Sequence, residues 1–149
     1  SKDEHYWQHH FNDRSASSWE GFSFEQLCLH HLTHIKQGLG ISGVATEAST
    51  WRHVAAKGEE RRGAQIDLVI KRADRMIHLV EMKFAASRYN ITKDYAAQLR
   101  ERRQTFMEDE RLTTTPVFTF ITPYGLTRGL YSSLVHSELT AEHLFAAVK

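Results

Sequence analysis

Two acidic residues and a lysine, Asp67, Glu81 and Lys83, have the types and spacing needed to hydrolyse a phosphodiester. Glu81 and Lys83 are two positions apart, so on a strand their side chains point to the same side. Asp67 lies in a second apolar segment that can pair with the first as a hairpin. Two carboxylates on adjacent strands form a hard oxygen site that suits Mg²⁺ or Mn²⁺. Such a metal polarises a phosphoryl group and generates hydroxide, while the lysine offsets the charge that develops in the transition state.

The strand that carries Glu81 is predicted to be covered on both faces for most of its length. Ile77 and Leu79 precede Glu81 on one face, and the other face is mostly apolar. A charged side chain on a covered face is costly unless it is paired or bound to a metal. A lone Glu-x-Lys is usually an exposed strand pair, and it arises by chance about once in two chains of this length. The strand context and Asp67 on the partner strand favour a functional site instead.

The hydrophobic pattern predicts the elements that must position these residues. Ser17 and Glu20 fit a capping box that opens a helix over residues 18–37, which ends before Gly38 and Gly40. Thr92 is the predicted N-cap of a second long helix that runs to about residue 111. The other expected elements are a short helix over residues 5–11, strands over 41–48, 65–71, 76–84, 117–122 and 134–138, residues 51–55 as an extension or partner of the first strand, a charged loop over 57–63, and a last helix from Thr140 to residue 147.

This order predicts an α/β fold in which a central mixed sheet carries helices on both faces. The chain has 149 residues, of which 41% are hydrophobic, and this length fits a single domain.

No run approaches the roughly 18 apolar residues of a membrane span, and no apolar leader is present. The one cysteine, Cys28, cannot form an internal disulfide. We therefore expect a cytoplasmic protein without a membrane partner.

Glu25 is a further acidic candidate on the first predicted helix. Its spacing to Cys28, Leu29 and Leu32 places it on the apolar, inward face of that helix. Periodicity alone leaves open whether Glu25 serves a site or only marks the boundary of that face.

Three short motifs resemble those of the PD-(D/E)xK nuclease superfamily. They are Gly21-Phe22-Ser23-Phe24-Glu25 on the helix, Gln65-Ile66-Asp67 on one strand and Glu81-Met82-Lys83 on the next. The predicted order over residues 18–122 is similar to the restriction-endonuclease-like α-β-β-β-α-β core of that superfamily. Residues 19–27 look more specifically like the C-terminal nuclease-like domain of bacterial P-loop (AAA-type) ATP-binding proteins. Ile66 stands where the family has a proline, which is not a metal ligand.

The resemblance implies a role for each charged residue. Asp67, Glu81 and Glu25 would be metal ligands for Mg²⁺ or Mn²⁺, helped by the backbone carbonyl of Met82. Lys83 would orient the attacking water or stabilise the transition state. The implied activity is metal-dependent hydrolysis of phosphodiester bonds, with DNA favoured over RNA. The alternative is a non-cleaving module that binds nucleic acid or a partner and regulates an attached ATPase.

The resemblance also bears on domain organisation. Residues 1–149 would form one nuclease-like domain, with residues 123–149 as a C-terminal extension of the core. The chain contains no G-x-x-x-x-G-K-[ST] motif and does not begin with Met. We therefore expect a domain excised from a longer protein whose N-terminal P-loop ATPase domain is its partner.

Weaker candidates for nucleic-acid contacts are Arg61 and Arg62 in the charged loop, and Tyr95 and Gln98 on the second long helix. Two glutamates in the loop favour a solvated segment there, and the formal net charge of +1 is not by itself a nucleic-acid signature. Three further arginines of that helix, Arg100, Arg102 and Arg103, have acidic neighbours and indicate surface ion pairs. His30 and His34 share a helix face but lack a third metal ligand, so a His-rich surface is expected.

Overall fold

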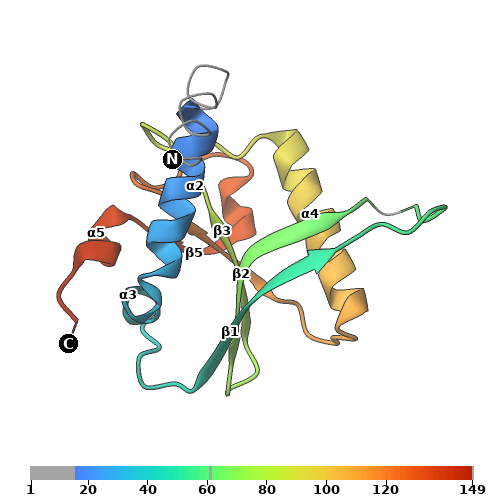
Figure 1. Ribbon diagram of the computed structural model, residues 1–149, viewed down its shortest axis with the longest axis horizontal. Helices are drawn as coiled ribbons and strands as arrows, with labels where there is room; N and C mark the ends of the chain where they lie inside the picture. Colours follow the sequence, from blue (N-terminus) through green and yellow to red (C-terminus); the bar gives the residue numbers. More distant parts are fainter. Residues whose placement is uncertain (1–15, 61, 149) are drawn as a thin grey trace, which may run out of the picture.

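The computed structural model describes residues 16–60 and 62–148 (Figure 1), with residues 16–18 described as backbone only. The helix expected over residues 5–11 and the residue Arg61 lie outside the described residues. The protein is an α/β fold whose elements follow the order α2, α3, β1, β2, β3, α4, β4, β5, α5.

Five strands form one mixed sheet in the order β1-β2-β3-β4-β5. Their bounds are β1 Thr46–His53, β2 Ala64–Arg72, β3 Ile77–Met82, β4 Val117–Ile121 and β5 Val135–Leu139. β1, β2 and β3 are joined antiparallel, whereas β4 and β5 each run parallel to the strand before them. The expected hairpin between β2 and β3 and the expected edge strand β5 are both confirmed.

Helices cover both faces of this sheet (Figure 1). Their bounds are α2 Ala16–Leu29, α3 Leu32–Gly38, α4 Lys93–Asp109 and α5 Ala141–Phe145, with a short 3₁₀ turn at Ser132–Leu134. Residues of α2, α3 and α5 pack on one face of the sheet, and α4 packs on the other. Thr92 caps α4 as predicted, because its side chain accepts a hydrogen bond from the Tyr95 N–H at 3.1 Å. Thr140 is confirmed as the N-cap of the last helix, which ends at residue 145.

The first part of the chain departs from the prediction at three points. The helix expected over residues 18–37 is interrupted at residues 30–31, where the His31 ring bonds the Leu27 carbonyl at 2.6 Å. Since α2 begins at Ala16, Ser17 lies inside the helix and is not its N-cap. The first strand begins at Thr46 rather than at residue 41, because Gly40 (φ +72°) is followed by a turn. That strand continues to His53, so most of the segment 51–55 is its extension.

The two faces of the sheet carry two separate hydrophobic clusters, and β3 lies between them. All six residues of β3 are buried. Val80 and Met82 belong to the cluster under α2 and α3, whereas Ile77 and Leu79 belong to the cluster under α4. A polar side chain on β3 therefore needs a partner from the covering elements.

His78 meets this requirement at the start of β3. It is 2% exposed, and its Nδ1 lies 2.9 Å from the Thr119 hydroxyl. Arg72 can only donate, so its Nη1 at 3.3 Å makes Nε2 the acceptor and indicates a neutral ring. Burial lowers the pKa of His78 to about 4, and the charge of Arg72 adds to this effect.

A neutral, buried His78 predicts a loss of stability in acid. The unfolded chain takes up a proton near pH 6.5 while the folded ring resists until about pH 4, so stability is complete above pH 6.5 and falls through that window. We expect the free energy of unfolding to drop by about 1–2 kcal/mol more in the parent than in H78Q, allowing for solvent screening. Urea unfolding at pH 7 and pH 4.5 measures this difference. The exposed-site variant H30Q is the matched control, and an equal drop in H78Q and the parent would contradict the assignment.

Candidate active site

Four of the predicted site residues come together where the regular pairing between β2 and β3 ends. Glu81 is the fifth residue of β3, Lys83 follows its end, Asp67 lies on β2 and Glu25 lies on α2. Burial raises the pKa of Glu25, the charge of Asp67 raises it further and Lys83 lowers it. The charge of Asp67 likewise raises the pKa of Glu81, and the charge of Lys83 lowers it. Glu25 and Glu81 therefore each lie within electrostatic reach of Asp67 and Lys83.

A β-bulge sets the position of Asp67. Ser49 pairs with Val69 and Trp51 pairs with Ile66, so two residues of β2 oppose the single residue between them on β1. Asp67 is one of those two. The extra residue breaks the alternation of β2: Ile66 packs in the cluster under α4, whereas Leu68 packs in the cluster under α2. The predicted hairpin placed Asp67 on the strand next to Glu81 but did not include the bulge.

The Asp67 carboxylate then reaches the end of β3. Its Oδ2 accepts a hydrogen bond from the Met82 N–H at 3.1 Å. The regular β2–β3 register ends one step earlier, at the pair Leu68 and Val80. A side-chain carboxylate therefore substitutes for the strand carbonyl at this point and ties Asp67 to Glu81-Met82-Lys83.

Glu81 is the most buried charged group of the site. It is 1% exposed, and its Oε1 lies 2.6 Å from Arg102 Nη1 of α4. Burial raises the pKa of Glu81 to about 7, against the lowering effect of the Arg102 charge. A buried carboxylate with one close guanidinium is a charge-assisted pair that holds α4 against the sheet.

Lys83 lies over an aromatic group from α4. Its ammonium nitrogen is 5.0 Å from the centre of the Tyr95 ring, within the range of a cation–π contact. Tyr95 also makes edge contacts with Phe120 and Tyr89 at 6.2–6.3 Å between ring centres. Among the residues the structure describes, the buried Tyr95 hydroxyl has no partner in strict hydrogen-bond geometry, but it lies within electrostatic reach of the Arg102 guanidinium. The Tyr95 ring thus positions Lys83, and the Tyr95 hydroxyl lies beside the site.

Two of the weaker candidates, Arg62 and Gln98, line a pocket of about 130 Å³ together with Arg102, Glu101, Thr105 and the backbone at residues 63–64. Arg62 forms an ion pair with Glu101 at 3.2 Å. The structure therefore brings Arg62 and Gln98 together next to Arg102, whereas Tyr95 interacts with both Lys83 and Arg102.

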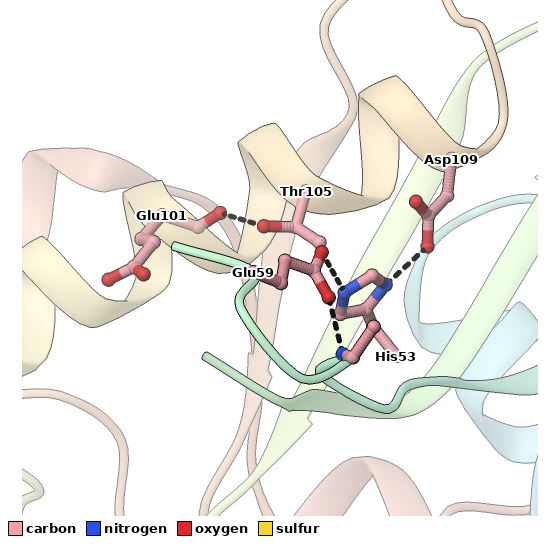
Figure 2. A network of polar contacts seen from close by, with 6 residues as sticks. His53, Glu59, Glu101, Thr105 and Asp109 are labelled. Carbon is pink, nitrogen blue, oxygen red and sulfur yellow. Dashed lines mark hydrogen bonds and ion pairs between the residues drawn. The ribbon is translucent and has the colours of Figure 1, made fainter. Parts of the chain in front are cut away.

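The loop that carries Arg62 is fastened to α4 by His53. Figure 2 shows the His53 ring between Glu59 of the loop, at 2.8 Å, and Asp109 at the end of α4, at 3.0 Å. Glu59 also accepts the Ala56 N–H at 2.7 Å. The hydrogen bonds to Asp109 and Glu59 raise the pKa of His53, so this contact is strongest when the ring is charged. The pocket wall around Arg62 is thereby held to the helix.

The site contains side chains of the type that bind a hard divalent cation. Glu25, Asp67 and Glu81 supply three carboxylates, against which Lys83 and Arg102 supply two positive charges. Carboxylate oxygens are the ligands that Mg²⁺ and Mn²⁺ prefer. Within the described part of the chain, no three His, Cys, Asp or Glu side chains are gathered as a ready-made metal site. Asp67 and Glu81 are instead directed at protein partners, the Met82 N–H and Arg102.

Arg102 is the site residue that sequence reasoning missed, because the helix was interpreted as carrying surface ion pairs. Its side chain is 19% exposed and its partner is the buried Glu81. The signal was available in the spacing: Leu99 and Phe106, three residues before and four after Arg102, are both buried. An arginine within the apolar stripe of a helix indicates a buried partner.

Comparisons with known proteins add little to this geometry. No family model matches the chain, and no curated protein matches it. The chain is similar to a crystal structure described as a protein of unknown function, AF1548, with 16% sequence identity and a TM-score of 0.48. The similarity covers 74% of this chain and 56% of that one, so this chain spans little more than half of that protein. In the described residues, no helix combines the length and apolar character needed to cross a membrane.

The burial of Glu81 predicts the cost of removing its partner. In R102M the carboxylate is left without a counter-ion, and we expect a loss of about 3 kcal/mol in unfolding free energy at pH 8.5. The loss is smaller at pH 5, below the Glu81 pKa of about 7, because the protonated acid needs no counter-ion. The matched control R62M breaks the exposed pair with Glu101 and costs less than about 1 kcal/mol. Denaturant unfolding at both pH values measures these terms, and equal losses in R102M and R62M would refute the buried pair.

Proposed function

We propose that this chain is a metal-dependent nuclease domain of the PD-(D/E)xK type that hydrolyses phosphodiester bonds, with DNA as the favoured substrate. The observation that carries the proposal is the meeting of Glu25, Asp67, Glu81 and Lys83, from one helix and two strands, at one end of a buried strand. The order α2, β1, β2, β3, α4, β4 supports a restriction-endonuclease-like core.

In this proposal each side chain has a role that its surroundings support. Asp67 and Glu81 hold Mg²⁺ or Mn²⁺, with Glu25 and the Met82 carbonyl as further oxygen ligands. When bound, the metal supplies Lewis-acid polarisation of the phosphoryl group and a water of lowered pKa. Lys83 places its ammonium near the phosphate oxygens and offsets their developing charge. The Tyr95 ring under Lys83 restricts where that ammonium can lie.

The wider context of the domain is part of the proposal. An N-terminal P-loop ATPase partner rests on the resemblance of residues 19–27, and a cytoplasmic location rests on the composition. DNA is favoured over RNA on the same resemblance. Activity of the isolated domain is therefore the direct test, and the ATPase is a requirement only if the domain alone is silent.

One observation favours a second candidate function, a non-cleaving module that binds nucleic acid or a partner. Arg102 occupies the Glu81 carboxylate that metal binding needs. If this pair is permanent, the acidic residues of the site bind no metal. Arg62 and Gln98 then line a pocket that binds nucleic acid or a partner without cleavage. The two functions differ in whether a divalent metal changes what the domain does to DNA.

The nuclease proposal predicts metal-dependent cleavage. The purified domain should cut supercoiled plasmid or linear single-stranded DNA with Mn²⁺ or Mg²⁺ and be inactive in EDTA. E81Q and K83M should each lose at least about 100-fold in rate, since each removes charge stabilisation of the transition state. E47Q, an exposed carboxylate on β1, is the matched control and should cut as the parent does. Gel electrophoresis of the time course measures the rate, and parental rates in both site variants would overturn the assignment.

A binding measurement separates the second candidate. For the non-cleaving module, fluorescence anisotropy with labelled DNA should show the same affinity in EDTA and in Mn²⁺, and no cleavage under either condition. For the nuclease, we expect tighter binding with metal in K83M, which keeps the carboxylates but cuts slowly, and a loss of that metal effect in E81Q.

A further inference from the structure

We propose that Arg102 is an exchangeable counter-ion, which neutralises Glu81 in the metal-free domain and binds a backbone phosphate of the nucleic acid in the adjacent pocket once a divalent cation has taken Glu81. This inference rests on the proposed function and adds to it a phosphate-binding site and an order of loading.

Arg102 lies on the boundary between the two sites. One of its guanidinium nitrogens is 2.6 Å from Glu81 Oε1, on the buried side. The same side chain lines the 130 Å³ pocket with Arg62 and Gln98 on the outer side. Its exposed fraction of 19% is intermediate between that of Glu81 and that of a surface arginine such as Arg62. The guanidinium therefore borders both the Glu81 carboxylate and the pocket.

The charges of the pocket change with the state of Glu81. In the metal-free domain Arg62 is paired with Glu101 and Arg102 is paired with Glu81, so the two arginines are both compensated. When a cation holds Glu81, Arg102 loses its partner and the pocket gains a net positive charge. A phosphodiester carries one negative charge and accepts hydrogen bonds in pairs from a guanidinium. The pocket thus becomes complementary to a backbone phosphate only when the metal is bound.

The neighbours of Arg102 fit this ligand. Gln98 is one turn before Arg102 on α4 and offers an amide donor to the same pocket. Arg62 lines the same pocket from the β1–β2 loop. Arginine and glutamine are typical phosphate-contacting groups.

Two consequences follow from the exchange. Arg102 competes with the metal, so the metal-free domain holds cations more weakly than its carboxylates alone would. Metal and nucleic acid also strengthen each other's binding, because each one releases the group that the other needs. The pocket therefore binds phosphate more weakly until the metal is present.

Mn²⁺ binding, measured by the electron paramagnetic resonance signal of the free ion, tests the competition without any cleavage assay. We expect R102M to bind Mn²⁺ about tenfold more tightly than the parent, in the range of coupling that one charge provides. R62M should leave the Mn²⁺ affinity unchanged, because Arg62 does not contact a carboxylate of the metal site. E81Q should weaken Mn²⁺ binding.

The thymidine dinucleotide TpT, a phosphodiester too short to span distant sites, tests the pocket by calorimetry in the presence of Mn²⁺. R102M and R62M should each weaken TpT binding about tenfold, as expected for loss of one charged phosphate contact. In the parent, omission of Mn²⁺ should weaken TpT binding, whereas in R102M it should have a smaller effect. Should R102M fail to fold, R102K is the second variant, because it keeps the positive charge but lacks the paired N–H donors of the guanidinium. We expect R102K to retain the parental Mn²⁺ affinity and to bind TpT about tenfold more weakly.

The outcomes separate the exchange from the proposed function. If E81Q weakens Mn²⁺ binding but R102M does not tighten it, Arg102 is a fixed structural partner and the exchange is overturned while the metal site stands. If E81Q leaves Mn²⁺ binding unchanged, both the metal site and the exchange are overturned. Parental TpT affinity in R102K would equally refute a phosphate site built on the guanidinium.

Discussion

The buried carboxylate of Glu81 is the constraint on which the other features of the site depend. β3 is covered on both faces, so a charge at its fifth position has no access to water. Glu81 must then find a cation, share a proton or bind a metal. Arg102 of α4 supplies the cation, and this contact adds to the apolar packing that holds the helix over the sheet. The bulge in β2 completes the arrangement by turning Asp67 toward the same strand end.

Much of the fold was predictable because local and tertiary preferences agree. The hairpin β2–β3, the crossover through α4 with Thr92 as its cap, and the edge strand β5 all follow from apolar patterns and turn residues. The α2–α3 break was not predictable from periodicity, since the apolar pattern runs through it. At the break the His31 N–H donates to the Cys28 carbonyl and the His31 ring bonds the Leu27 carbonyl. The first strand was placed too early because Ile41 and Val44 are apolar, although they pack in a turn against the core.

The site, like the fold, has some features that follow from the sequence pattern and others that do not. The positions of Glu81 and Lys83 follow from strand alternation, and the inward position of Glu25 follows from helical spacing. The bulge at Asp67 has no signature in side-chain type, because any residue can occupy it. Arg102 had a signature, a cation in the apolar stripe of α4, but its partner could only be named once the helix was placed on the sheet. Long-range pairings of this kind are set by packing and not by local sequence.

The central claim is that Asp67 and Glu81 hold a divalent metal at the end of β3. A crystal of the domain grown or soaked with Mn²⁺ and measured for anomalous scattering tests this claim directly. We expect an anomalous peak within ligand distance of carboxylate oxygens of Asp67 and Glu81, with the Arg102 guanidinium moved off Glu81. Full retention of the Arg102–Glu81 pair at saturating Mn²⁺, with no peak between Asp67 and Glu81, would contradict it.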